Sequence, residues 1–216
     1  MFIGHFAVGF ASKRLAPRTS LVWLVLAPIF ADVLWPVFVL AGMEQVRIDP
    51  GNTAVTPLDF VSYPWSHSLL MLTVWGALFG AVYVLCTHDR RAALILAAGV
   101  VSHWVLDFVT HRPDLPLYPG GGPRVGLSLW SSIPATIAVE SVLFAAGLAL
   151  YFGATRAKNR KGTLGCWAFI VLLLFIYTAN LFGPPPPSPN AIAIAGLLAN
   201  LLLLWVWWFD RNREAS

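Results

Sequence analysis

The sequence is poor in charge. Charged residues make up 11% of its 216 residues, whereas 58% are hydrophobic and the mean hydropathy is +0.72. Ordinary soluble domains carry about 25% charged residues, and a soluble chain of this size could not bury so much apolar surface. Several apolar runs approach or exceed the roughly 20 residues that cross a bilayer. The shortage of charge therefore excludes an ordinary soluble domain and predicts an all-α, polytopic helical bundle embedded in a lipid bilayer.

Cysteine is also scarce. The two cysteines, Cys86 and Cys166, lie in or at the end of apolar segments and form no Cys-x-x-Cys pair, so we expect no disulfide framework. The N-terminus lacks a basic region followed by a small-residue cleavage site, and we expect no removable signal peptide. The net charge of +4 does not indicate nucleic-acid binding, because the basic residues lie in short loops between apolar segments.

Hydropathy and helix-breaking residues predict about seven membrane segments. They cover residues 2–16, 20–42, 66–87, 91–111, 128–153, 164–182 and 190–208. We expect residues 1–153 to form a membrane core that carries the functional site. Residues 154–216 are expected to be a two-helix extension, because their two apolar segments contain no ionisable residue.

The basic residues predict an orientation. If the N-terminus is outside and every segment crosses, eleven of the fourteen basic residues face the cytoplasm. The three that remain outside are Arg47, Arg112 and Arg124. Such an excess of Lys and Arg marks the cytoplasmic side of membrane proteins. We therefore expect an integral membrane protein with a cytoplasmic C-terminus.

Ionisable residues interrupt the apolar segments at compatible depths. In this topology seven of them lie in the outer half or near the middle of the membrane: His5, Asp32, His67, His103, Asp107, His111 and Glu140. An ionisable residue deep in a membrane helix costs a few kcal/mol, so such residues usually face a polar interior with a function. The pattern predicts a polar site toward the extracytoplasmic side.

The stretch SHWVLDFVTH has the spacing of a metal site. His103, Asp107 and His111 follow one another at intervals of four residues, which places them on one stripe of a helix. Imidazole and carboxylate are good ligands for a divalent ion such as zinc, and two side chains four residues apart can grip one ion. We predict a zinc-like ion held by His103, Asp107 and His67, with His5 and Asp32 as the next ligands.

The remaining groups have open roles. Glu140 is the only acid in a long apolar segment, and it could be a ligand or a general base. His111 could bind the metal or protonate a leaving group, and Asp114 could orient His111.

At these residues the chain resembles the LexA-regulated, membrane-bound metal-dependent hydrolases of the bacterial inner membrane. The matching stretches are GHFAVGF around His5, ADVLWP around Asp32, SHSLL around His67 and SHWVLDFVTH around His103. GLSLWSSIP, around Trp130, matches the segment that follows in the family. The resemblance covers roughly residues 1–150, and it implies metal-dependent hydrolysis.

Three functions are compatible with the sequence. The favoured one is hydrolysis of an amphiphilic substrate, such as a lipid phosphoester, by a metal centre at the outer membrane face. A proton- or ion-coupled transporter is the alternative, because intramembrane carboxylates and histidines also form ion pathways. A structural membrane protein whose metal only holds the helices together is the third.

Overall fold

The protein is mostly helical, and the computed structural model describes all 216 residues. Five helical spans are long and apolar enough to cross a membrane. They are α5 (Leu69–Thr87), α6 (Arg90–Thr110), α7 (Ile133–Ala154), α8 (Arg160–Phe182), and the pair α9 (Pro189–Ala199) and α10 (Leu202–Asp210). Large apolar side chains such as Leu85, Leu94 and Phe175 are exposed on these helices, as expected of surfaces that face lipid tails. The structure therefore does not support the prediction of about seven spans.

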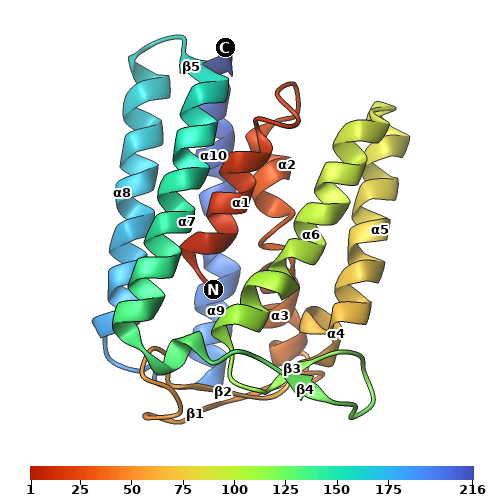
Figure 1. Cartoon of the computed structure of the whole chain (residues 1–216), viewed down its shortest axis with the longest axis vertical. Helices are drawn as coiled ribbons and strands as arrows, with labels where there is room; N and C mark the ends of the chain where they lie inside the picture. Colours follow the sequence, from red (N-terminus) through yellow and green to blue (C-terminus); the bar gives the residue numbers. More distant parts are fainter.

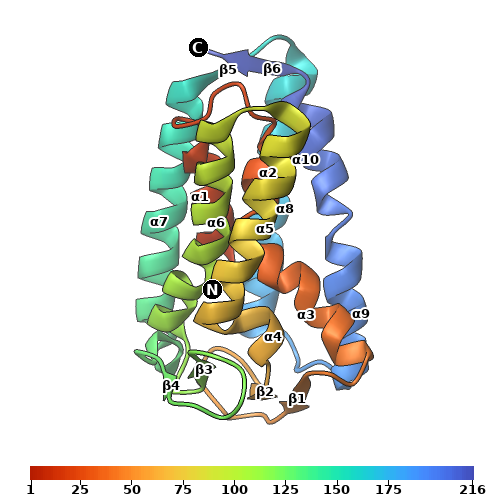
Figure 2. The same cartoon turned by 90° about the vertical axis from the view of Figure 1, so that its right-hand side faces the viewer.

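The difference lies in the first two predicted segments. Residues 2–16 form only α1 (Ile3–Ser12), and residues 20–42 form α2 (Leu21–Leu26) and α3 (Phe30–Leu40). A ten-residue helix is about 15 Å long, half of the hydrocarbon thickness. α1 begins inside the bundle, where Met1 is buried, and runs toward the end that holds the C-terminus (Figures 1 and 2). Hydropathy detects apolar residues, and it does not show that a helix starts in the middle of a bundle.

The break between α2 and α3 occurs at a proline. Pro28 has no N–H to donate, and its ring is incompatible with the preceding helical turn. α2 therefore ends at Leu26, and α3 starts at Phe30. The break leaves the Pro28 carbonyl oxygen free to accept a hydrogen bond from outside the helix.

Most of the long helices begin at a residue whose side chain caps the first turn. The capping side chains are those of Ser68, Asp89, Ser132, Asn159 and Ser188. Each accepts a hydrogen bond from a backbone N–H that has no partner within its helix. At the other end of α5, His88 adopts a left-handed conformation with φ 60°, which allows the tight turn into α6. These caps fix the helix ends at the two membrane faces.

The two ends of the bundle differ. One end carries the short strands β1 (Gln45–Ile48), β2 (Leu58–Ser62), β3 (Leu115–Pro116) and β4 (Arg124–Val125), with α4 (Pro64–His67) and the 3-10 turn η1 (Leu129–Ser131) (Figure 2). β1 pairs antiparallel with β2, and β3 with β4. We call this end the hairpin end.

The opposite end carries β5 (Thr155–Ala157) paired antiparallel with β6 (Arg213–Ala215), together with the α1–α2 loop and the α5–α6 turn (Figure 1). We call it the basic end, because the connections that hold eleven of the fourteen basic residues meet there.

A single apolar core joins the N-terminal and C-terminal parts of the chain. It includes Phe6 and Phe10 of α1, Phe144 of α7, and Phe169 of α8 with Phe209 of α10. α1 lies directly against α7, where a Cβ at Gly147 would meet the Ala7 backbone within 3 Å. Glycine permits this close approach, and it brings α7 alongside the buried start of α1.

Candidate metal centre

Four imidazoles converge on one buried carboxylate. Asp107 projects from α6 and is only 2% exposed. Its oxygens lie 3.1 Å from Nε2 of His5 and 3.1 Å from Nε2 of His103. Nε2 of His111 is 3.7 Å away, and Nε2 of His67 is 4.0 Å away. His103 of α6, His111 at the end of α6, His5 of the buried half-helix α1 and His67 of the short helix α4 thus direct the same ring nitrogen toward one point.

Asp32 adds a second carboxylate from α3. Its Oδ1 lies 3.6 Å from Nε2 of His67 and 3.9 Å from Nε2 of His103. Two sets of three donor atoms are compact enough for a metal ion, and within each set all three atoms lie within 4.8 Å of one another. One set is His5, His103 and Asp107, and the other is Asp32, His67 and His103. The structure therefore brings together all five residues predicted as ligands.

Backbone and side-chain partners fix the tautomer of His103. Nδ1 of His103 lies 2.7 Å from the Pro28 carbonyl oxygen. A carbonyl oxygen only accepts hydrogen bonds, so Nδ1 carries a proton, and in the neutral ring Nε2 holds the lone pair. This Nε2 atom is buried and makes no hydrogen bond in the protein. A buried nitrogen lone pair without a partner is what a metal ligand presents before the ion binds.

His67 is oriented by two residues that the sequence patterns did not indicate. Ser66 Oγ donates to Glu44 Oε2 over 2.6 Å, and it lies 2.6 Å from Nδ1 of His67. Because the serine hydrogen is used by the carboxylate, Oγ accepts from Nδ1–H, and Nε2 of His67 again carries the lone pair. Glu44 is buried and also accepts from the backbone N–H of Trp65 and of Ser66. Such outer partners set the orientation and basicity of metal-binding imidazoles.

His111 has the same arrangement on the hairpin side. Its Nδ1 donates to Asp114 Oδ1 over 3.0 Å, and the Tyr63 hydroxyl donates to the same oxygen over 2.9 Å. Burial alone would raise the pKa of Asp114, but hydrogen bonds from His111 and Tyr63 hold that pKa below its usual range. Burial and the nearby Asp114 raise the pKa of Tyr63 well above its usual range, so its hydroxyl stays a donor. Asp114 thus contacts and orients His111, which is one of the roles that the sequence left open for it.

Glu140 lies at the start of α1. Its Oε2 accepts hydrogen bonds from the backbone N–H of Phe2 over 2.9 Å and of Gly4 over 3.2 Å. The α-amino group of Met1 donates to Asp107 Oδ1 over 2.5 Å. Glu140 therefore anchors the buried end of the helix that carries His5. No hydrogen bond of the protein reaches its other oxygen, Oε1.

A cavity of about 420 Å³ opens beside these residues. Its polar wall includes Asp32, His67, Asp107, His111 and Glu140. The rest is mostly apolar and extends along α3 and α9 to the proline run that connects α8 with α9. Ligand pockets in proteins have this size and this combination of apolar walls with a few converging polar groups.

Glu44 and Ser66 are the residues that sequence reasoning missed. Ser66 directly precedes His67, and Glu44 is the single acid in the turn after α3. Their contact depends on how α3 and α4 pack, which no local spacing indicates. His88, by contrast, caps α5 at the basic end and takes no part in the cluster.

Comparison with known proteins supplies the family. A model of the YdjM inner membrane protein family matches residues 1–183. The chain belongs to the YdjM inner membrane protein family. The match confirms the family predicted from the stretches around His5, Asp32, His67 and His103, and it identifies an integral protein of the inner membrane. No curated protein and no solved structure matches the chain.

Proposed function

We propose that this protein is a metal-dependent hydrolase with its centre inside the bundle. The observation that carries the proposal is the shared orientation of the His67, His103 and His111 rings. In each ring Nδ1 is held by an outer partner, while Nε2 faces the Asp107 carboxylate at 3.1 to 4.0 Å. A metal ion bound between these nitrogens and the carboxylates would use the Nε2 atom of each neutral ring. Imidazole and carboxylate donors suit zinc and similar divalent ions.

The donor set fits one ion in contact with His103. Nδ1 of His103 is bonded to the Pro28 carbonyl, so the ring has a single nitrogen to offer. Because both compact sets of donors include His103, they are alternative ligand combinations around one ion. His103, Asp107 and His67 would hold it, with His5 and Asp32 completing the set.

The other groups would then perform acid–base work. When bound, the ion would supply Lewis-acid polarisation of the scissile bond and a more acidic water. Glu140 lines the cavity, and its Oε1 accepts no hydrogen bond from the protein, so this oxygen could accept a proton. His111 faces the same cavity, and Asp114 holds its Nδ1–H, so it is placed to carry a proton to the leaving group.

The cavity supports an amphiphilic substrate. Its polar wall is the candidate centre, and its long apolar wall follows α3 and α9 within the membrane. A molecule with a polar head and an apolar tail fits both walls, and we propose a phosphoester of a lipid as the substrate class. By the distribution of basic residues, the hairpin end would face the extracytoplasmic side and the C-terminus the cytoplasm.

Metal analysis and a substrate screen test this proposal together. The detergent-purified protein should hold about one zinc or similar ion per chain and should hydrolyse a lipid phosphate or a simple phosphoester. Metal without any hydrolysis over a broad ester and phosphoester screen would favour a structural metal. Absence of tightly held metal after purification with added zinc would contradict the proposal and favour transport.

Cysteine labelling tests the orientation. Single cysteines placed near Pro119 and near Pro186 should react with an impermeant reagent added to intact cells. One placed near Asn159 should react only after lysis. The opposite pattern would reverse the proposed orientation.

A further inference from the structure

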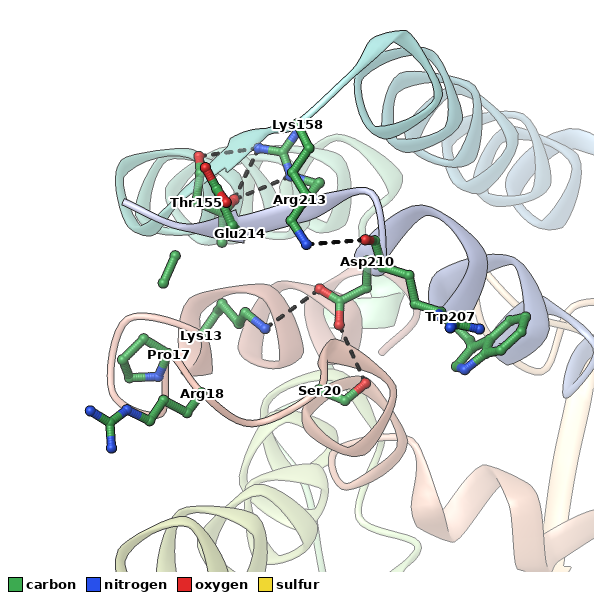
Figure 3. A pocket seen from close by; sticks show the side chains of 12 residues that line it. Lys13, Pro17, Arg18, Ser20, Thr155, Lys158, Trp207, Asp210, Arg213 and Glu214 are labelled. Atoms are coloured by element: carbon green, nitrogen blue, oxygen red, sulfur yellow. Dashed lines mark hydrogen bonds and ion pairs between the residues drawn. The ribbon is translucent and has the colours of Figure 1, made fainter.

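A second cavity lies at the basic end, far from the candidate metal centre. Its volume is about 430 Å³, and Figure 3 shows the side chains around it. Four parts of the chain build it: the α1–α2 loop, β5 with the residues after it, the end of α10, and β6. Five cationic side chains line it: Lys13, Arg18, Lys158, Arg211 and Arg213. Two acids are present, Asp210 and Glu214.

The carboxylates do not neutralise these cations. Asp210 is used by Lys13 at 3.5 Å and by Ser20 and the backbone of Leu21. Glu214 pairs at 2.8 Å with Arg156, which is not among the residues that line the cavity. The ion pairs of the chain include none with Arg18, Lys158, Arg211 or Arg213. Four of the five cations around the cavity therefore have no carboxylate partner.

Arg213 makes the shortage of negative charge most evident. It is only 8% exposed, and its guanidinium donates to neutral oxygens alone: the hydroxyl and carbonyl of Thr155 and the carbonyl of Gly162. It also lies over the rings of Tyr151 and Phe152. A buried guanidinium is stable when its charge is balanced, and protein dipoles and ring faces balance only part of it. The cavity beside Arg213 is the place where an anion would complete the balance.

The position of the cavity indicates where the anion comes from. Trp207 lines it and is half-exposed, and Arg211 lies over the Trp207 ring at 4.8 Å. Tryptophan collects at the level of the lipid headgroups. Basic pockets between helix ends at this level are suited to phosphate-bearing headgroups, since arginine matches phosphate oxygens in geometry and charge.

We propose that this cavity binds a phosphate group, supplied by the headgroup of an anionic phospholipid. Arg18, Lys158 and Arg211 form the exposed rim that meets the phosphate. Lys13 and Arg213 form the buried floor. Because Lys13 caps the end of α1, a bound lipid would tie this half-helix to β5, β6 and α10.

The test measures lipid binding to the full-length protein purified in a neutral detergent. Native mass spectrometry and thermal unfolding are recorded with phosphatidylglycerol, with phosphatidylcholine of the same acyl chains, and with inorganic phosphate. Phosphatidylglycerol should bind roughly tenfold more tightly than phosphatidylcholine and should raise the unfolding temperature.

A triple substitution and a matched control decide the site. Arg18→Gln, Lys158→Gln and Arg211→Gln together remove three rim charges but none of the bonds of Lys13 or Arg213, so the fold should be retained. Arg90→Gln, Arg91→Gln and Arg160→Gln together remove the same charge from exposed residues at the same end, outside the cavity.

The triple rim variant should lose the preference for phosphatidylglycerol, and the control should keep it. If both variants lose the preference for phosphatidylglycerol equally, or if neither variant loses it, the proposal is overturned. If inorganic phosphate binds the wild type as tightly as the lipid and fails to bind the rim variant, the phosphate site stands and its ligand comes from solution. None of these results depends on metal at the other centre.

Discussion

The half of the bundle that adjoins the hairpin end, called the hairpin half below, contains the candidate metal centre. It and the basic end both concentrate ionisable groups, but they balance charge in opposite ways. In the hairpin half, buried carboxylates and imidazoles contact one another, and outer partners hold most of the rings in one orientation. At the basic end, cations outnumber carboxylates, and most have no ion-pair partner. A charge inside a bundle must find its counter-charge in the protein. A charge at the membrane face can find it in the headgroup layer.

Removal of the central carboxylate, Asp107, should have the largest effect on stability and metal binding. Asp107→Asn leaves the Met1 ammonium and the surrounding imidazoles without their shared partner. Removing one member of a buried charged pair costs about 3–5 kcal/mol, and the proposed ion also loses a ligand. We expect a large loss of stability in denaturant unfolding and loss of bound metal by elemental analysis.

His88→Ala is the matched control, since His88 is an exposed residue at the basic end. It should leave metal content unchanged, and it should lower stability by much less than Asp107→Asn, since only the left-handed turn after α5 is affected. An Asp107→Asn protein with normal metal content would rule out the proposed centre, because no other carboxylate approaches as many of the imidazoles.

Glu140→Gln distinguishes two roles of Glu140: anchoring the start of α1 and acting as the general base. The amide oxygen can still accept from the N–H groups of Phe2 and Gly4, so α1 should stay in place and metal binding should survive. If Oε1 is the general base, turnover falls by roughly 10²- to 10⁴-fold.

Glu140→Ala is the companion variant, because it removes the anchor as well. It should also weaken metal binding by releasing the helix that carries His5. Full turnover in Glu140→Gln together with weakened metal binding in Glu140→Ala would assign Glu140 an anchoring role alone.

The candidate site was more predictable than the fold. The stripe of His103, Asp107 and His111 follows from helical spacing, which is local. The approach of His5, Asp32 and His67 was expected from depths assigned with seven crossing segments, and these residues do meet although the first two segments do not cross as predicted. The half-helix α1 could not be predicted in this way, because its start depends on the distant Glu140. The roles of Glu44 and Pro28 also depend on tertiary contacts.

Substitution of the residues that hold Nδ1 of the ligand imidazoles should have intermediate effects on metal affinity. Glu44→Gln weakens the hold on Ser66, and Ser66→Ala removes the acceptor of His67 Nδ1–H. Loss of such a partner typically lowers metal affinity by 10- to 100-fold. Competition with a chelator of known affinity measures the change.

Ser68→Ala serves as the control for Ser66→Ala, since Ser68 caps α5 and makes no hydrogen bond to the ring of His67. It should lower stability slightly and leave metal affinity unchanged. Equal metal affinity in all of these variants would show that His67 is no ligand.

The smallest effect on turnover is expected from a substitution at the solvent-exposed Arg112, at the hairpin end. Arg112 donates to Asp114 at 3.1 Å and to Asp59 at 2.5 Å, but its side chain is 40% exposed. Exposed ion pairs contribute about 0–1 kcal/mol, and Asp114 keeps its bonds to His111 and Tyr63 without it. Arg112→Gln should therefore lower turnover by less than tenfold.

At about 1 M salt, where the screening length is about 3 Å, the turnover of the variant and that of the wild type should become nearly equal. Arg124→Gln, which removes an exposed cation from the same end, should have no effect at either salt concentration. A loss of a hundredfold or more in Arg112→Gln, unchanged by salt, would mean that Arg112 acts within the centre and that the polar site reaches further toward the hairpins than the buried cluster.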